Sequence, residues 1–372
     1  MTNENSSKKK LNIKGKDIIF AITIIILPAI SGIFSSVIAP LIVTIINNFG
    51  NSYEISFAAS SFSNTIFNLS NVLCYVIIFV LGLLLLKNIK KGSAAIGMIA
   101  VASVLSTFVS ILVSSVIFII CSMVHGAYGT ALSIESIISI IITIILTAVF
   151  TLIIFFVSIL TENRIGTKKI NDNAKIVSLS VLTAALPVLN IVTSLVTNAI
   201  TVITSQYLHN FTSSIFASLI ANNINSAIWN TVVIIIIAAI VILSIVVFKD
   251  SNAGFSAVGC YFFFKTLLLS VSNLIAGIIA LFDADVASIF SSIAFYIIYI
   301  LTAIASTAAF IGIEIIFRKK AQKAAATNET MAQTEEFSIP DFESILENPD
   351  ISRQTVLSYE TEEVSDTNFF SE

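Results

Sequence analysis

The sequence predicts an all-α, polytopic integral membrane protein with eight transmembrane helices, arranged as two tandem, parallel four-helix repeats with both termini in the cytoplasm. Three observations predict this fold class. First, 56% of the 372 residues are hydrophobic and only 11% are charged, whereas a soluble domain carries about 25% charged residues. Second, among the connections between the long apolar runs, lysine and arginine occur only in alternate ones. Third, the first half of the chain aligns with the second half.

The predicted spans are the long apolar runs themselves. A helix needs about 20 mostly apolar residues to cross the hydrocarbon core of a bilayer. The runs that meet this requirement are residues 18–46, 65–86, 95–122, 133–160, 175–205, 226–248, 256–281 and 287–317. The first run follows a lysine-rich start, but it exceeds the apolar core of a signal peptide, which has about 7–15 residues. The lipid bilayer is therefore the first predicted partner of this chain.

The distribution of basic residues predicts the orientation. All but two of the 19 lysines and arginines lie in the N-terminal tail, in the second–third, fourth–fifth and sixth–seventh connections, or just after the last span. The exceptions are Lys265, inside a span, and Arg353, in the C-terminal tail. The four remaining connections contain no lysine or arginine. Because these residues favour the cytoplasmic side, both termini are predicted to be cytoplasmic.

Four regions follow from this pattern. Residues 1–17 are a basic cytoplasmic tail, residues 18–163 and 174–319 are the two transmembrane repeats, and residues 320–372 are an acidic tail. Twelve of the 22 acidic residues lie between Glu329 and Glu372. Such a segment buries too little apolar surface to offset its ordering entropy, so the tail is predicted to be disordered. Two interpretations of the tail stay open: it is a solubilising acidic segment on the cytoplasmic side, or it recruits a cytoplasmic protein partner.

The two repeats are related by a nearly constant offset. Pro28 matches Pro187 at an offset of 159 residues, and after a three-residue shift Lys87 matches Lys249. The segment GSAAIG at 92–97 then matches GFSAVG at 254–259. Apolar matches carry little weight in isoleucine-rich helices, but Pro, Gly and Lys in unbroken order favour a tandem duplication. Because four spans is an even number, both copies have the same orientation, as in the parallel repeats of some transporters.

Path-lining candidates are polar residues on one face of the fifth span, with smaller counterparts in the first span. In the fifth span they recur at steps of three and four, which places them on one helical face. They are Asn190, Ser194, Thr197, Asn198 and Thr201, and the counterparts are Ser31 and Ser35. Lipid does not accommodate such a face, so it meets protein or water. Two interpretations stay open: the two spans pack together through hydroxyl groups, or they line a path for a solute.

Pro28 and Pro187 occupy matched positions in the same two spans. A proline inside a helix removes a backbone donor and clashes with the carbonyl four residues earlier, so each is predicted to kink its helix. The matched pair is a candidate hinge. Proline is also common in membrane helices that have no such role.

Lys265 is a basic residue well inside a predicted span. A charge within the membrane is expensive and is a functional hypothesis by default. Its predicted partner is Glu314, near the cytoplasmic end of the eighth span, because a lysine side chain can extend toward the membrane surface. The duplication aligns Lys265 with Ser103 and Glu314 with Ile154, so the first repeat lacks both charges. The two residues form either a structural ion pair or a substrate or proton site.

Four asparagines mark a candidate outer vestibule. They lie in matched segments near the starts of the second and sixth spans: Asn64, Asn71, Asn223 and Asn230. The two members of each pair are about two helical turns apart, on one face of their helix. Ordinary polar helix starts explain these residues equally well.

Several kinds of site are not predicted. The three cysteines lie far apart in apolar runs and the two histidines are scattered, so neither a disulfide framework nor a metal centre is expected. The sequence contains no motif of zinc hydrolases, serine hydrolases, P-loop proteins or dinucleotide-binding proteins. The chain is therefore predicted to lack a cofactor and a nucleic-acid partner and not to be an enzyme. The oligomeric state does not follow from the sequence.

The sequence is compatible with three functions. The first is a transporter or permease-like carrier that moves a small neutral or zwitterionic solute through a path between two pseudo-symmetric halves. The second is a non-transporting scaffold, or the permease subunit of a larger complex, that recruits partners through the acidic tail. The third is a membrane-embedded transferase that uses carboxylates on the outer side. Richness in isoleucine and asparagine, with lysine preferred over arginine, indicates a prokaryote and hence the plasma membrane.

Overall fold

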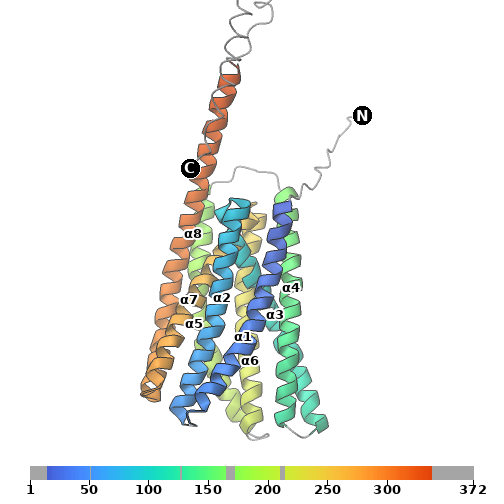
Figure 1. The fold of residues 1–372 in the computed structure, drawn as a ribbon, viewed down its shortest axis with the longest axis vertical. Helices are drawn as coiled ribbons and strands as arrows, with labels where there is room; N and C mark the ends of the chain where they lie inside the picture. Colours follow the sequence, from blue (N-terminus) through green and yellow to red (C-terminus); the bar gives the residue numbers. More distant parts are fainter. Residues whose placement is uncertain (1–14, 51, 126–127, 165–171, 210–213, 337–372) are drawn as a thin grey trace, which may run out of the picture. The chain divides into compact units, whose positions relative to one another are not determined.

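A computed structural model describes residues 15–50, 52–125, 128–164, 172–209 and 214–336 of the chain. Within these residues it contains eight helices and no strands (Figure 1). The helices are α1 (Gly15–Asn47), α2 (Tyr53–Leu86), α3 (Ile89–His125), α4 (Tyr128–Arg164), α5 (Asp172–His209), α6 (Ser214–Val246), α7 (Ser251–Ala280) and α8 (Ala284–Glu336). Each of the eight is long and apolar enough to cross a membrane. The prediction of a helical, multi-pass membrane protein is confirmed.

Two helices begin about three turns earlier than their predicted spans. α2 starts at Tyr53 and α6 at Ser214, in segments rich in serine and asparagine that hydropathy assigns to connections. Ser52 caps α2, because its side-chain oxygen accepts a hydrogen bond from the backbone of Ile55 at 3.4 Å. Serine at this position satisfies a donor that the first helical turn leaves unpaired. The polar segments therefore extend the helices instead of separating them.

The eighth helix continues beyond the predicted span. It ends at Glu336, so residues 320–336 of the predicted acidic tail are helical. Hydropathy falls after Lys319, but the segment AQKAAA at 321–326 consists of strong helix formers. Helix propensity therefore extends the element where the apolar pattern stops. The rest of the predicted tail and residues 1–14 lie outside the described residues.

The outer surface of the helices is apolar. Many large side chains are about half exposed along whole helices, among them Ile22, Ile30, Ile145, Val181 and Ile293. A soluble protein does not expose contiguous apolar surface on this scale, because water would drive it to associate. These side chains face lipid hydrocarbon.

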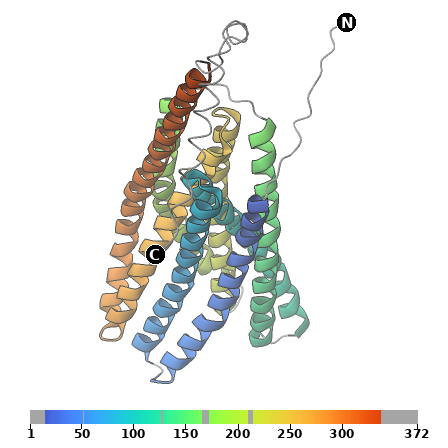
Figure 2. The same ribbon diagram turned by 45° about the horizontal axis from the view of Figure 1, so that its top comes forward.

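The centre of the bundle is formed by α3 and α7. They pack against each other, and each also packs against α2 and α6. α1 packs against α2 and α4, beside which it runs in Figures 1 and 2, whereas α5 packs against α6 and α7. The first and fifth spans therefore lie in different parts of the bundle. Of the two interpretations of their polar faces, the one in which these spans pack together is not met, and α3 and α7 make the central contact instead.

Glycine sets the distance between α3 and α7. A Cβ atom at Gly97 would lie 1.8 Å from the carbonyl oxygen of Phe255, and one at Gly259 would lie 2.4 Å from that of Ser93. No side chain fits in either position, so the two backbones touch directly. The hydroxyls of Ser93 and Ser256 are then 2.7 Å apart and share a hydrogen bond.

The turns before α3 and α7 have the same construction. Among the described residues, Lys87 and Lys249 are the non-glycine residues with positive φ, at 51° and 54°. Asn88 follows Lys87, and its side chain accepts from the backbone of Lys90 at 3.0 Å. Asp250 follows Lys249, and its side chain accepts from the backbone of Ala253 at 3.2 Å. In both turns a left-handed lysine ends one helix and an Asn or Asp side chain caps the next.

Candidate functional site

The polar face of α5 divides into a buried and an exposed part. Asn190 and Thr197 are buried, whereas Ser194 and Thr201 are partly buried. Asn198 is exposed on the outside of the helix. The structure therefore turns most of the predicted path-lining residues toward protein but points Asn198 away from it.

The counterparts in α1 serve a different contact. Ser31 is buried and its hydroxyl donates to the hydroxyl of Ser70, on α2, at 3.1 Å. Ser35 is also buried and bonds to the carbonyl of Gly32 in its own helix at 3.1 Å. Because α1 packs on α2 and α4, these residues do not face the polar side of α5. The predicted prolines lie inside the unbroken helices α1 and α5, and the hinge stays a prediction.

Lys265 lies halfway along α7, within a group of aromatic rings. Its Nζ atom is 4.3 Å from the ring centroid of Trp229, on α6. The centroids of Tyr261 and Phe262, on α7, are both 5.7 Å away, and that of Tyr299, on α8, is 5.9 Å away. Only 9% of the residue is exposed. The amine is thus surrounded by rings from three helices of the second half of the chain, which we call the aromatic chamber.

The aromatic chamber offsets part of the cost of a buried charge. A cation–π contact contributes about 0.5–2 kcal/mol, whereas the burial of an ion costs several kcal/mol. Among the described residues, no carboxylate lies within ion-pair distance of Lys265. The neighbours that the structure gives for this amine are therefore aromatic rings.

Asn190 joins this group through Tyr261. Its amide nitrogen donates to the hydroxyl of Tyr261, and the residue is fully buried. Its amide oxygen has no hydrogen-bond partner among the described residues. The hydroxyl of Thr302, which is fully buried on α8, also lacks a partner there. Of these two uncharged polar groups, Thr302 thus lies on a helix that carries the aromatic chamber, and Asn190 lies on α5 and reaches the chamber through Tyr261.

The predicted pairing of Lys265 with Glu314 is replaced by a different arrangement. Glu314 contacts Lys90 at 2.7 Å and Lys175 at 3.4 Å. The reason is distance along α7: Lys265 is 14 residues from the first residue of the helix, Ser251, or about 21 Å at 1.5 Å per residue. Extension of the side chain by about one turn does not cover that distance. Glu314 instead meets lysines at the ends of α3 and α5.

These charges form a four-residue cluster. Asp250 contacts Lys90 at 2.5 Å and Lys175 at 2.9 Å, and Glu314 contacts the same two amines. Burial raises the pKa of the Asp250 carboxyl, but the two lysines lower it by more, so its pKa lies below the ordinary value. Lys175 also has a more exposed partner, Asp172, at 3.6 Å. The cluster ties α3 of the first half to α5, α7 and α8 of the second.

The candidate vestibule residues differ in how far they are exposed. Asn64 is exposed and Asn71 is partly buried on α2, whereas Asn230 is buried and bonds to the carbonyl of Ser226 in its own helix at 2.8 Å. Asn223 belongs to α6, but its side chain lies outside the described residues. The vestibule therefore stays a prediction.

No protein-family model, curated protein or solved structure matches this chain. Within the described residues, no group of three or more His, Cys, Asp or Glu side chains is placed to hold a metal ion.

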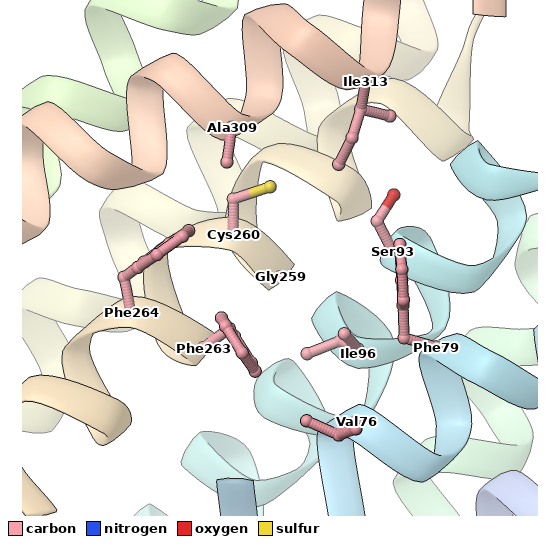
Figure 3. Close-up of a pocket in the computed structure, with 10 residues that line it drawn as sticks. All are labelled: Val76, Phe79, Ser93, Ile96, Gly259, Cys260, Phe263, Phe264, Ala309 and Ile313. Atoms are coloured by element: carbon pink, nitrogen blue, oxygen red, sulfur yellow. The ribbon is translucent and has the colours of Figure 1, made fainter. Parts of the chain in front are cut away.

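Two apolar cavities open between helices near the centre of the bundle. The first, in Figure 3, has a volume of about 190 Å³ and is lined by residues of α2, α3, α7 and α8 that include Val76, Phe79, Ser93, Cys260, Phe263 and Ile313. The second, of about 260 Å³, is lined by residues of α3, α4, α6 and α7 that include Val101, Ile153, Ala238, Val241 and Phe255. Ser93 is the one hydroxyl among the lining residues of the two cavities, and it already shares a hydrogen bond with Ser256, so neither lining offers the set of polar groups that a polar solute needs.

Sequence reasoning identified Lys265 and Asn190 but not their surroundings. Trp229 is the sole tryptophan of the chain, and it lies in the same predicted repeat as Lys265, residues 174–319. A single tryptophan inside an apolar span was the available signal, because its indole N–H needs a partner or a polar neighbour when buried. Lys90 and Asp250 gave no such signal, since both read as ordinary residues of a cytoplasmic turn.

Proposed function

We propose that the protein is a permease-like carrier that moves a small neutral or zwitterionic solute across the plasma membrane, through a polar route inside the second four-helix half. The proposal is carried by the position of the buried polar atoms that have no hydrogen-bond partner among the described residues. Among the described residues, five of the six uncharged oxygens of this kind belong to α5 and α8: Ser180, Asn190, Thr201, Thr302 and Thr307. In hydrocarbon such a group costs several kcal/mol unless something satisfies it. Water or a solute in a polar route would do so.

A tandem duplication is part of the proposal, and several matched contacts support it. In the turns at Lys87 and Lys249, a lysine with positive φ is followed by an Asn or Asp side chain that accepts from the first turn of the next helix. A Cβ atom at Gly92 would approach Gly82, while one at Gly254 would approach Ser244. Gly254 lies 162 residues after Gly92, and Ser244 lies 162 residues after Gly82. The same offset relates Gly97 to Gly259 at the crossing of α3 and α7.

The two cavities extend the match. Val76, Phe79 and Ser93 in the first correspond to Ala238, Val241 and Phe255 in the second. This correspondence supports two halves related by a pseudo-twofold axis that passes through the α3–α7 crossing. Because the backbones touch at that crossing, we place the route inside one half instead of between the halves.

The duplication also indicates which half carries the route. At the aligned positions, Asn190 is replaced by Ser31 and Trp229 by Ser70 in the first half. The hydroxyl of Ser31 donates to that of Ser70 at 3.1 Å. The first half therefore pairs its own polar groups at the positions aligned with Asn190 and Trp229. Lys265 aligns with Ser103. The first half therefore acts as the support, and the second half carries the solute.

Cysteine accessibility tests the route. In a chain whose Cys74, Cys121 and Cys260 are replaced, Thr197→Cys and Ser31→Cys are nearly isosteric changes at buried positions of α5 and α1. A membrane-impermeant thiol reagent requires water to reach the thiol. We expect it to label Thr197→Cys from one side of the membrane and to leave Ser31→Cys unlabelled. If a folded Thr197→Cys protein is labelled from neither side, the polar face of α5 is packing and the proposal is wrong.

The scaffold function has one observation in its favour. The helical segment 320–336 extends α8 past the apolar run and into the acidic part of the chain. A helix of this kind is a recognisable surface for a partner protein. Loss of partner recovery on deletion of residues 320–372, with solute uptake unchanged, would separate this function from transport.

A further inference from the structure

We propose that the aromatic chamber and Asn190 form a recognition site for an amino-carboxylate zwitterion, in which Lys265 binds the carboxylate and Asn190 accepts a hydrogen bond from the ammonium group. The inference rests on the proposed carrier function for its biological meaning. The binding site itself is a property of the chain that can be tested without transport.

The carboxylate part of the argument comes from the surroundings of Lys265. The other described carboxylates that are buried near this half, Asp250 and Glu314, already contact Lys90 and Lys175. Around Lys265 there are aromatic faces from α6, α7 and α8. Rings stabilise an ammonium ion but supply no counter-charge. A carboxylate from a ligand supplies the counter-charge that the described residues lack.

The ammonium part comes from Asn190. Its nitrogen is occupied by the hydroxyl of Tyr261, and its buried oxygen is left without a donor. An oxygen in this condition accepts an N–H group, and an ammonium group is a strong donor of that kind. Tyr261 contacts both sides of the site, since its ring also lies 5.7 Å from the amine of Lys265. Because Tyr261 links the two residues, we assign both contacts to one small molecule that carries opposite charges.

The first half of the chain shows that the fold does not require these residues. It has the equivalent helices, yet the aligned positions hold Ser31, Ser70 and Ser103 in place of Asn190, Trp229 and Lys265. A buried amine and an unpartnered amide oxygen are unfavourable for stability unless a ligand uses them. Their restriction to one of two similar halves indicates a binding role.

Trp229 provides the readout. It is the only tryptophan in the chain, and its ring lies 4.3 Å from the amine of Lys265. Ligand bound to that amine changes the surroundings of the indole and hence its fluorescence. The full-length chain, purified into lipid nanodiscs, can be titrated with glycine, alanine and leucine. Acetate and glycinamide are matched probes that carry only the carboxylate or only the ammonium group.

We expect at least one of the zwitterions to change the fluorescence in a saturable way, with acetate and glycinamide each binding about tenfold more weakly or worse. Lys265→Met and Lys265→Gln should abolish the response, and Asn190→Ala should weaken zwitterion binding about tenfold. Ser103→Ala, at the aligned position of the first half, is the control and should leave binding unchanged. Circular dichroism establishes that each variant is folded.

Three results would overturn the inference: no saturable response to any of the zwitterions, a response that survives in folded Lys265→Met, or acetate binding as tightly as the best zwitterion. Uptake into proteoliposomes separates the two proposals. Binding that requires Lys265 but is accompanied by no uptake would refute the carrier function and leave the site standing. Uptake that is unaffected by Lys265→Met would refute the site and leave the carrier function standing.

Discussion

Neutralising Glu314 tests whether the four-charge cluster holds the two halves of the chain together. The side chain is 3% exposed and contacts the amines of Lys90 at 2.7 Å and Lys175 at 3.4 Å. Glu314→Gln keeps its shape but leaves the buried Lys90 and the partly buried Lys175 to share Asp250, with the exposed Asp172 as a further partner of Lys175. Breaking a buried ion pair costs about 3–5 kcal/mol. Because Asp250 still contacts both lysines, we expect the lower end, about 3 kcal/mol.

The matched control is Asp172→Asn. That carboxylate is 3.6 Å from the same Lys175, but its side chain is 60% exposed, and exposed ion pairs contribute about 0–1 kcal/mol. Thermal unfolding of the purified full-length chain, followed by Trp229 fluorescence, measures both variants. At about 2–4 °C per kcal/mol for chains of moderate size, Glu314→Gln should lower the apparent Tm by about 5 °C or more, and Asp172→Asn by much less.

A double variant examines the cause. If the lost stability comes from unpaired charge, removing a lysine together with the carboxylate restores part of it, so Lys90→Met with Glu314→Gln should cost less than the sum of the two single changes. The reasoning is refuted if Glu314→Gln is no more destabilising than Asp172→Asn. It is equally refuted if the double variant is fully additive, because the contacts would then be independent.

Three further predictions follow from other contacts. Gly97→Ala places a Cβ atom 1.8 Å from a backbone oxygen of α7, so it should lower the free energy of unfolding by about 3 kcal/mol or more. The control is Gly312→Ala, whose Cβ atom has nothing within 4 Å and which should be neutral. The yield and the Tm of the folded protein measure both variants. Because the pKa of Asp250 is lowered in the folded chain, its contribution to stability is present above the ordinary aspartate pKa and lost as the pH falls through the folded-state value. Asp250→Asn should therefore flatten the acid limb of a plot of Tm against pH, and an unchanged limb would contradict this. Trp229→Phe leaves a weaker cation–π partner for Lys265 and should lower stability by about 1 kcal/mol, an effect that disappears in a Lys265→Met background if the contact is its source.

The membrane architecture could be predicted from the sequence because its causes are local. Each span is an uninterrupted apolar run, and each run must satisfy its own backbone hydrogen bonds in lipid, which forces a helix. The ends were less predictable, since hydropathy and helix propensity differ there. α2 and α6 begin in polar segments, and α8 continues to Glu336 through an alanine-rich one.

Sequence reasoning also selected Lys265, Asn190 and Glu314 as unusual, because an ionisable or amide group in an apolar span is expensive wherever it lies. It assigned the wrong neighbours. Glu314 lies beside Lys90, more than two hundred residues away in the chain, and Lys265 lies among rings from three helices. Neither contact has a signal in the local pattern of residues.

The sequence by itself therefore determined that eight apolar helices form, where along the chain they lie, and which polar groups need an explanation. The tertiary structure decided that α3 and α7 form the centre, that α1 and α5 lie apart, and which charges meet. The physical reason is that apolar helices in lipid have little hydrophobic preference for one neighbour over another. Their arrangement depends on a few close contacts, such as Gly97 with Phe255 and Gly259 with Ser93, whose fit exists only once the helices are side by side.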